Sequence, residues 1–231
     1  MSKMRLKYIK GNEVKYISHL DLLRTFQRAI KRAEIPIQYS QGFNPHPIVS
    51  FGLPLPVGTT SESEYMEMEL AADVESVHVT ARLNKALPKG IKILEAVTVT
   101  DKKDKILNKI CLASYDVTIH LKKKSDMDFS QALLNLTASD KLVVEKSTKK
   151  GIKEVDILQD IHALEVAAQG EKRVVFRMQL SAGSARNLKP ELVLQAVEKY
   201  VPGFEIDFAA IHRTKLLANK DGRMVEPMSV F

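Results

Sequence analysis

The stretch Tyr16–Phe51, which reads YISHLDLLRTFQRAIKRAEIPIQYSQGFNPHPIVSF, places the strongest constraint on how this chain can fold. Ser18 is a good helix N-cap, because its hydroxyl can accept a hydrogen bond from a backbone N–H one turn later. Asp21 is placed to bond back to the cap and to face the positive end of the helix dipole. Neither Pro nor Gly follows until Pro36, so the sequence predicts a helix over Ser18–Ala33.

This predicted helix has two unlike faces. At about 100° per residue its apolar side chains fall on one arc and its cations on the opposite arc. The apolar arc holds Leu23, Phe26, Ile30 and Ala33, with His19 on the same side, and the basic arc holds Arg24, Arg28, Lys31 and Arg32. Because no acid lies four positions after these cations to pair with them, they fit either a solvated face or a track for an anionic partner.

The loop after this helix is rich in residues that restrict or free the backbone. Its two X-Pro bonds hold the preceding residues extended, whereas Gly42 permits angles that a side chain would forbid. Stiff loops on a scaffold often carry binding sites, although an ordinary turn explains the same composition. The candidate loop site consists of Gly42, Phe43, Asn44 and His46.

Positive charge is concentrated at the start of the chain. The net charge is +7, and residues 1–32 alone hold nine Lys and Arg against two acids. The remaining residues therefore sum to zero, and the local basicity favours a surface for phosphates or for an acidic partner. Residues 62–75 hold six acids and no base, so this segment is expected to repel nucleic acid or to dock a basic partner.

Cysteine usage and hydropathy exclude several classes of protein. Cys111 is the only cysteine, which excludes intrachain disulfides, three-cysteine iron–sulfur motifs and Cys-rich zinc sites. No apolar run is long enough to span a bilayer, and the first residues lack the apolar block of a signal peptide. We expect a cytoplasmic protein with no membrane partner, no metal site and no cofactor held by this chain itself.

The expected element order favours an α+β protein. Over residues 1–100 the patterns predict strand, helix, strand, strand, helix, strand, with strands near 48–55 and 64–70 and a second helix over 73–87. The polar residues 101–111 are predicted to be a linker, and over 112–231 the order recurs with an inserted hairpin. The sequence thus predicts two ferredoxin-like (βαββαβ) units in tandem, with antiparallel sheets and helices packed on one face. The end of the chain, from Asn219 to Phe231, is expected to be a turn and a loosely held tail.

A second group of cations is a weaker candidate for anion binding. Arg186, Asn187 and Lys189 precede a helix that Pro190 is suited to begin, and helix N-termini bind anions readily. Arg213 is expected at the end of the last strand, predicted over 204–210. An ordinary loop and a charged strand edge explain these residues equally well.

The run YISHLDLLRTFQRAIKRAEIPIQYSQGFNPHPIVSFGLPLPVG, with SESEYMEMEL and LNKALPKGIKILEA after it, resembles the bacterial radical-SAM-linked protein family, a domain of unknown function. The resemblance covers nearly the whole chain. The matching positions are Ser18, His19, Asp21, Arg24, Gly42, Phe43, Asn44, Pro45, His46 and Pro47. It implies partnership with a radical SAM enzyme, which would itself carry the iron–sulfur cluster and S-adenosylmethionine, and it supplies no catalytic residues.

Three functions are compatible with these observations. The first is a non-catalytic accessory module of a radical SAM enzyme that binds RNA through the basic helix face. The second is a metal-independent RNA-processing nuclease that uses His19 or His46, with Asp21 as a further candidate. The third is a protein-docking module for an acidic partner. No iron–sulfur, metal or nucleotide motif is present in the sequence, which favours a binding protein over an enzyme.

Overall fold

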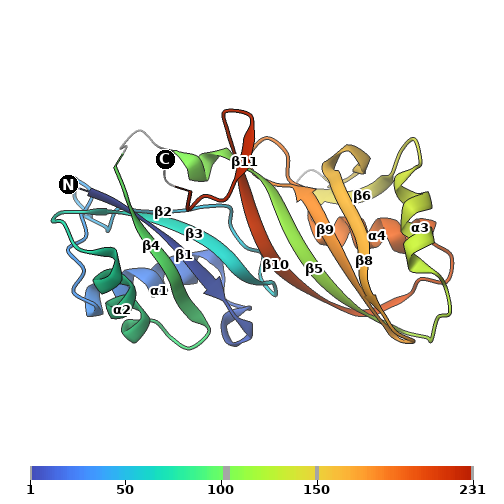
Figure 1. The fold of residues 1–231 in the computed structure, drawn as a ribbon, viewed down its shortest axis with the longest axis horizontal. Helices are drawn as coiled ribbons and strands as arrows, with labels where there is room; N and C mark the ends of the chain where they lie inside the picture. Colours follow the sequence, from blue (N-terminus) through green and yellow to red (C-terminus); the bar gives the residue numbers. More distant parts are fainter. Residues whose placement is uncertain (1, 101–104, 149–150, 230–231) are drawn as a thin grey trace. The chain divides into compact units, whose positions relative to one another are not determined.

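The α+β class is confirmed by the computed structural model, which describes residues 2–100, 105–148 and 151–229 (Figure 1). Within those ranges it contains four α-helices, a nine-stranded sheet and a two-stranded sheet. The larger sheet has the strand order β4-β1-β3-β10-β5-β9-β8, with β2 on β3 and β11 on β10. The chain divides into a first unit, residues 1–110 and 215–231, and a second unit, residues 111–214.

The first unit follows the predicted element order. Its elements are β1 (Ser2–Lys10), α1 (His19–Arg32), β2 (Val49–Phe51), β3 (Thr60–Leu70), α2 (Ser76–Ala86) and β4 (Ile91–Val99). Strand β1 pairs antiparallel with both β3 and β4, and β2 pairs with β3. Strand β2 is shorter than predicted, because Pro54 and Pro56 lack the N–H that would extend its pairing. Helix α2 begins after Glu75 rather than at Asp73, and a short 3-10 helix, Asn12–Val14, lies between β1 and α1.

One face of this sheet forms the apolar core against α1 and α2 (Figure 1). Because side chains alternate along a strand, Leu6 on β1 and Met66 on β3 lie on this face. From α1 the buried residues are Leu22, Phe26, Ala29 and Ile30. The predicted arc was therefore slightly misplaced, since Leu23 is only half-buried and Leu22 takes the buried position.

The opposite face of the same sheet is polar, yet much of it is buried. Four residues on this face are at most 8% exposed: Arg5, Ser63, Tyr65 and Glu67. The C-terminal segment binds here, since Arg5 Nη1 donates to the Pro227 carbonyl at 2.6 Å. The prediction of a loosely held tail was therefore wrong, because this segment supplies acceptors that a buried guanidinium needs.

Two further segments of the first unit, the expected linker and the acidic stretch, are partly buried. Part of the expected linker is packed, since residues 106–109 form a 3-10 helix with Ile106 and Leu107 buried; residues 101–104 lie outside the described ranges. Of the six acids in residues 62–75, Glu64 and Glu67 are buried, and Glu67 is paired with Lys3 and Arg5. The other four, Glu62, Glu69, Asp73 and Glu75, are exposed.

The second unit contains the predicted inserted hairpin. Its elements are β5 (Ile110–Leu121), α3 (Phe129–Thr137), β6 (Val143–Thr148), β7 (Gly151–Asp156), β8 (Ile161–Gln169), β9 (Arg173–Ser181) and α4 (Pro190–Tyr200). Strands β6 and β7 form the two-stranded sheet, whereas β8 and β9 form a second hairpin in which β9 pairs with β5.

The last strands differ most from the sequence prediction. Strand β10 (Ile206–Lys220) has 15 residues and continues well beyond the predicted 204–210. Its residues up to Thr214 belong to the second unit and those from Lys215 to the first. After it the turn at Asp221 and Gly222, both with positive φ, leads into β11 (Arg223–Val225).

Candidate functional site

The start of α1 is fixed by the predicted cap. Ser18 Oγ accepts a hydrogen bond from the Asp21 backbone N–H at 3.2 Å and donates to Asp21 Oδ2 at 2.7 Å. Asp21 Oδ1 in turn accepts from Arg24 Nη1 at 3.3 Å. The Ser18 hydroxyl, and after it the Arg24 charge, lower the pKa of Asp21 below its ordinary value. Asp21 is thus a carboxylate engaged by the helix terminus, which makes it a poor proton acceptor.

The four cations of α1 are all exposed on the face opposite the core. Arg28 contacts only the Thr25 hydroxyl, at 3.5 Å, and within the described residues neither Arg28 nor Lys31 has a carboxylate partner. Arg32 Nη2 donates to the Ala86 carbonyl at the end of α2, at 2.5 Å. The basic face predicted from the sequence therefore exists, and most of its charge is not neutralised by the protein.

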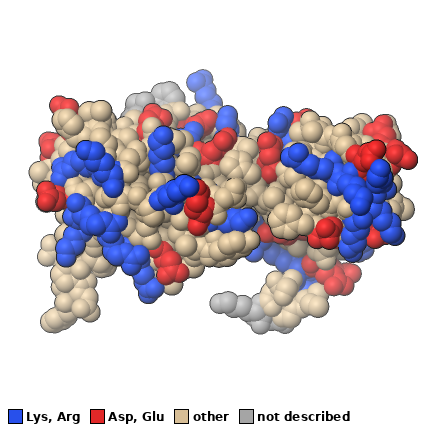
Figure 2. Space-filling model, turned by 90° about the horizontal axis from the view of Figure 1, so that it is seen from below, with Lys and Arg blue, Asp and Glu red and all other residues tan. Residues whose placement is uncertain are grey.

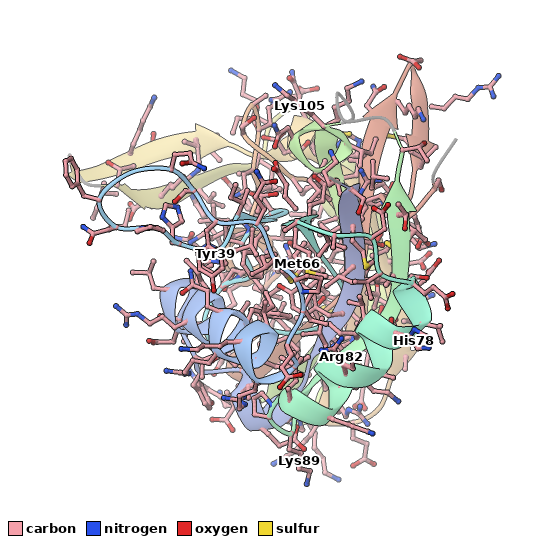
Figure 3. All side chains as sticks on the ribbon, turned by 90° about the vertical axis from the view of Figure 1, so that its left-hand side faces the viewer. Tyr39, Met66, His78, Arg82, Lys89 and Lys105 are labelled. Carbon is pink, nitrogen blue, oxygen red and sulfur yellow. The ribbon has the colours of Figure 1, made fainter. Side chains whose placement is uncertain are left out.

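A groove between α1 and α2 extends this basic face. It has a volume of about 430 Å³ and is lined by Arg32, Ala33, Glu34, Arg82, Lys85 and Ala86. Arg82 Nη2 donates to the Glu34 carbonyl at 2.6 Å and lies 3.9 Å from its carboxylate, which is mostly exposed. Figure 3 shows Arg82 on α2 beside α1, and Figure 2 shows Lys and Arg side chains gathered over the part of the first unit that is seen from below.

Sequence reasoning missed the contribution of α2 to this groove. Arg82 and Lys85 are three residues apart, so they lie on one side of the helix. That spacing was visible, but only the packing of the two helices shows that it meets the basic face of α1. We refer to Arg24, Arg28, Lys31, Arg32, Arg82 and Lys85 together as the basic surface.

The predicted loop site is a hairpin-like projection. At its base Tyr39 bridges Pro47, and the Ser40 N–H donates to the His46 carbonyl at 2.9 Å. Ser40 Oγ lies 2.9 Å from His46 Nδ1 and accepts from the His46 N–H at 3.1 Å. Gly42 has a φ of +123°, a conformation that favours glycine. Phe43 beside it is fully exposed, and Asn44 is also exposed.

The two candidate histidines occupy different surroundings. The His19 ring lies against Phe51 with ring centroids 5.5 Å apart, although His19 is exposed. His46 is held by Ser40 in the loop, and over the described ranges no hydrogen bond or ring contact joins it to His19. Within the described residues the two histidines therefore do not share one site, and the side chain that contacts the His46 ring is the Ser40 hydroxyl.

The second anion site predicted from the sequence is not assembled as expected. Arg186 Nε pairs with Asp160 Oδ1 at 2.8 Å, and Lys189 is the N-cap residue of α4 with an exposed side chain, as is Asn187. Arg213 is fully buried and has partners of its own. Its placement at a charged strand end was wrong, because β10 continues to Lys220 and Arg213 lies in its middle.

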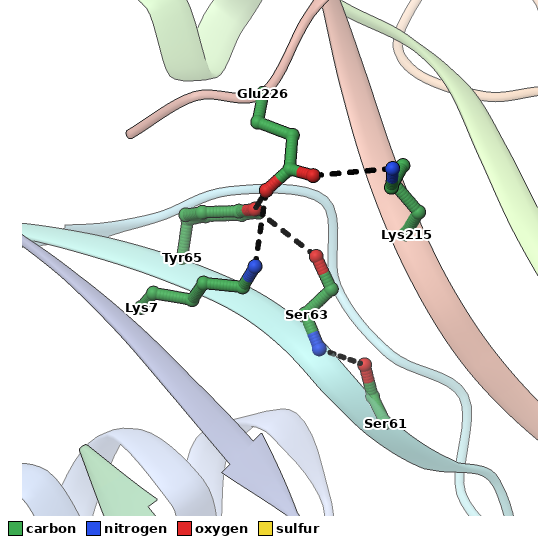
Figure 4. Close-up of polar contacts among 6 residues, drawn as sticks. All are labelled: Lys7, Ser61, Ser63, Tyr65, Lys215 and Glu226. Carbon is green, nitrogen blue, oxygen red and sulfur yellow. Dashed lines mark hydrogen bonds and ion pairs between the residues drawn. The ribbon is translucent and has the colours of Figure 1, made fainter. Parts of the chain in front are cut away.

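A polar cluster that the sequence did not indicate lies on the polar face of the first unit's sheet (Figure 4). Glu226 accepts from Lys7 Nζ at 3.0 Å and from Lys215 Nζ at 3.2 Å, and the Tyr65 hydroxyl lies 3.5 Å from it. Partial burial raises the pKa of Glu226, but the hydrogen bonds and charges of the two lysines lower it further, so the net pKa is below its ordinary value. Strand alternation placed Lys7 and Tyr65 on the non-core face, but no pattern linked them to residue 226.

Among the residues that the structure describes, no group of three or more His, Cys, Asp and Glu is placed to hold a metal ion. None of the helices in the described ranges is long and apolar enough to cross a bilayer.

Comparison with solved structures gives distant similarities. The chain aligns with a structure described as a Cbf5-Nop10-Gar1 complex at 11% identity and a TM-score of 0.48, covering 93% of this chain and 48% of that one. An archaeal box H/ACA sRNP Nop10-Cbf5 complex matches at 10% identity and a TM-score of 0.46, and the alignment covers 92% of this chain and 46% of that one. An H/ACA RNP bound to a substrate RNA containing 2'-deoxyuridine matches at 10% identity and a TM-score of 0.48, and the alignment covers 100% of this chain and 50% of that one. The chain thus spans about half the length of these solved chains.

No curated protein matches the chain. A family model described as an uncharacterized protein conserved in bacteria, DUF2344, matches residues 3–190, which is most of the sequence. The chain belongs to this bacterial family.

Proposed function

We propose that this chain is a non-catalytic accessory module that binds RNA through the basic surface and serves a radical SAM enzyme. The observation that carries the RNA-binding part is the groove between α1 and α2, where cations from two helices meet. Among the described residues, the six cations of the basic surface have two carboxylate partners: Asp21 pairs with Arg24, and the exposed Glu34 pairs with Arg82.

Such a surface suits a phosphate backbone on physical grounds. Phosphate contacts supply most of the affinity in non-specific nucleic-acid binding, and they come from Lys and Arg that the protein does not already neutralise. Arg32 and Arg82 are each held by a backbone carbonyl, which leaves part of each guanidinium fork free for an anion. We propose RNA, and not DNA, as the partner of the basic surface, so binding of both nucleic acids has to be measured.

The partnership with a radical SAM enzyme rests on the resemblance of the Tyr16–Phe51 block to the radical-SAM-linked family. An exposed and stiffened loop with a fully exposed Phe43 at its tip is compatible with docking to such an enzyme. The partner, and not this chain, would hold the iron–sulfur cluster and S-adenosylmethionine.

We also infer that the two units are ferredoxin-like and arranged in tandem. The strand order β4-β1-β3, with β2 on β3, supports this for the first unit. The order β10-β5-β9-β8, with the β6–β7 hairpin as an insertion, supports it for the second.

The test of RNA binding replaces Arg24, Arg28, Lys31, Arg32, Arg82 and Lys85 by Gln in the full chain. Affinity for a single-stranded RNA, and for DNA of the same sequence, is measured by fluorescence anisotropy at several salt concentrations. We expect weaker binding, and the log–log salt slope should shrink by roughly 0.7–0.9 per lost phosphate contact. The matched control replaces Lys122, Lys123 and Lys124, an exposed basic run in the second unit in which Lys123 and Lys124 are already paired with acids.

The outcomes separate the alternatives. An unchanged slope in a folded variant would leave the basic surface as a solvated face or a dock for an acidic protein. Metal-free cleavage of the RNA that is lost in His46→Ala would favour the nuclease instead.

A further inference from the structure

Donors from three strands converge on the carboxylate of Glu226 (Figure 4). Lys7 Nζ on β1 contacts Oε2 at 3.0 Å, Lys215 Nζ on β10 contacts Oε1 at 3.2 Å, and the Tyr65 hydroxyl on β3 lies 3.5 Å from Oε2. Both carboxylate oxygens are therefore bound. The donors lie on strands, whereas Glu226 lies in the segment after β11, so its side chain can turn away without breaking the sheet pairing. The backbone next to it stays in place, because the Pro227 carbonyl is bound by Arg5.

The strand side of this cluster is organised independently of Glu226. Tyr65 is buried, and its hydroxyl is 3.0 Å from Ser63 Oγ. The Ser63 N–H donates in turn to Ser61 Oγ at 3.1 Å. Burial raises the pKa of Tyr65 well above its ordinary value, so the hydroxyl keeps its proton and can act as a neutral donor.

The charges of the cluster do not balance. Lys7 and Lys215 carry two positive charges, and Glu226 supplies one negative charge. Glu64 is the other acid that acts on Tyr65, but it points to the opposite face because side chains alternate along β3. A phosphate monoester, with a charge of about −1.5 to −2 at neutral pH, would match the two lysines better than one carboxylate does.

The cluster is also reachable from solvent. The side chains of Lys7, Glu226 and Lys215 are 22%, 34% and 50% exposed. Ion pairs with this degree of exposure contribute little to stability, so an external anion that binds more tightly can replace the carboxylate.

We propose that Lys7, Tyr65 and Lys215 form a binding site for a terminal phosphate group, which the Glu226 carboxylate occupies in this structure as an internal substitute. This inference does not rest on RNA binding by the basic surface, because the site lies on the sheet face opposite α1. The phosphate belongs either to a small phosphate monoester or to the 5′ end of an RNA, and both present the same chemistry to the lysines.

The test uses the full chain with Glu226→Gln, which removes the resident charge and keeps the shape. The probes are uridine monophosphate and a short oligouridylate with either a 5′-phosphate or a 5′-hydroxyl, titrated by calorimetry. Removing a like charge from the site should tighten binding of the 5′-phosphate probes by about tenfold. Adding Lys215→Gln should abolish that gain, and Tyr65→Phe should reduce it. Glu205→Gln, which breaks the exposed pair with Lys123, is the matched control and should show no gain.

Each outcome decides the proposal. A gain for both phosphate probes indicates that a small phosphate monoester suffices, and a gain for the oligonucleotide alone identifies an RNA end; either supports the site. Equal affinities of the wild-type chain and a folded Glu226→Gln variant would make the cluster a structural ion pair and overturn it. If the Glu226→Gln variant melts at a lower temperature than the wild type, the test uses chains that keep Glu226. In these chains Lys215→Gln must weaken the binding of uridine monophosphate, and Glu205→Gln must leave it unchanged.

Discussion

Arg5 and Glu67 are direct cross-strand partners on β1 and β3, and both are buried on the face of the sheet opposite α1 and α2. Arg5 Nε and Nη2 both donate to Glu67 Oε1, at 2.8 and 2.6 Å. The remaining guanidinium nitrogen donates to Pro227, so this pair also fixes the C-terminal segment on the sheet.

Removing one member of this pair should be costly. Glu67→Ala leaves a buried guanidinium without its charge partner, and we expect a loss of about 3–5 kcal/mol in the free energy of unfolding. The double variant Arg5→Met with Glu67→Leu should lose much less, because it removes both charges of this buried pair. Urea denaturation measures both; equal losses in the single and double variants would contradict this account.

The cap of α1 gives a smaller effect. Ser18→Ala removes the acceptor for the Asp21 N–H and should cost about 1 kcal/mol of stability. Ser184→Ala, in an exposed loop of the second unit, is the control and should stay within about 0.5 kcal/mol of the wild type. Thermal melts of the two variants suffice, and indistinguishable melting temperatures would mean that the cap is not needed.

Substitutions on the buried face of α1 should lower the stability of the chain without changing its affinity for RNA. Phe26 is fully buried, so Phe26→Ala should cost about 3–5 kcal/mol while leaving the RNA affinity of the folded fraction unchanged. Leu23→Ala should cost clearly less, because Leu23 is only half-buried. Chemical denaturation and RNA titration of the same preparations provide the measurement. A fall in affinity without a fall in stability would place Phe26 in the binding surface.

The contribution of Glu226 to stability should depend on pH. Its pKa is lower in the folded chain than the unfolded value of about 4.3. At a pH between these two pKa values the unfolded state therefore binds more protons than the folded state. The stabilisation is therefore present above the unfolded pKa and is lost as the pH falls through the folded pKa. The difference in melting temperature between the wild type and Glu226→Gln should shrink as the pH is lowered from 6 to about 3. A constant difference would show that Lys7 and Lys215 do not interact with this carboxylate.

The single cysteine limits the cofactors of the isolated chain. Cys111 is half-buried, and one thiolate cannot hold a cluster that takes three or four. Anaerobic reconstitution with iron and sulfide should leave no stoichiometric cluster on this chain, as judged by iron content and visible absorbance. A cluster that is lost in Cys111→Ala would contradict this.

The sequence by itself determined the local elements and the basic face of α1. Ser18 capped the helix as predicted, because capping depends on residues within one turn. The cations at 24, 28, 31 and 32 are exposed, because the 3.6-residue period separates them from the buried positions. The hairpins β6–β7 and β8–β9 were also predictable, since alternation on both sides of a turn is a local signal.

Only the tertiary structure decided what lies far apart in the sequence. Three features depend on packing between distant segments. Residues 215–231 return to the first unit, Arg82 and Lys85 extend the basic face of α1, and Glu226 lies between Lys7 and Lys215. Arg213 was misplaced for the same reason, because the length of β10 is set by the strands beside it and not by its own residues. Alternation along β1 and β3 places Arg5, Lys7 and Tyr65 on the face opposite the apolar core. Whether such a face meets water or another segment is a matter of long-range burial, on which a period of two carries no information.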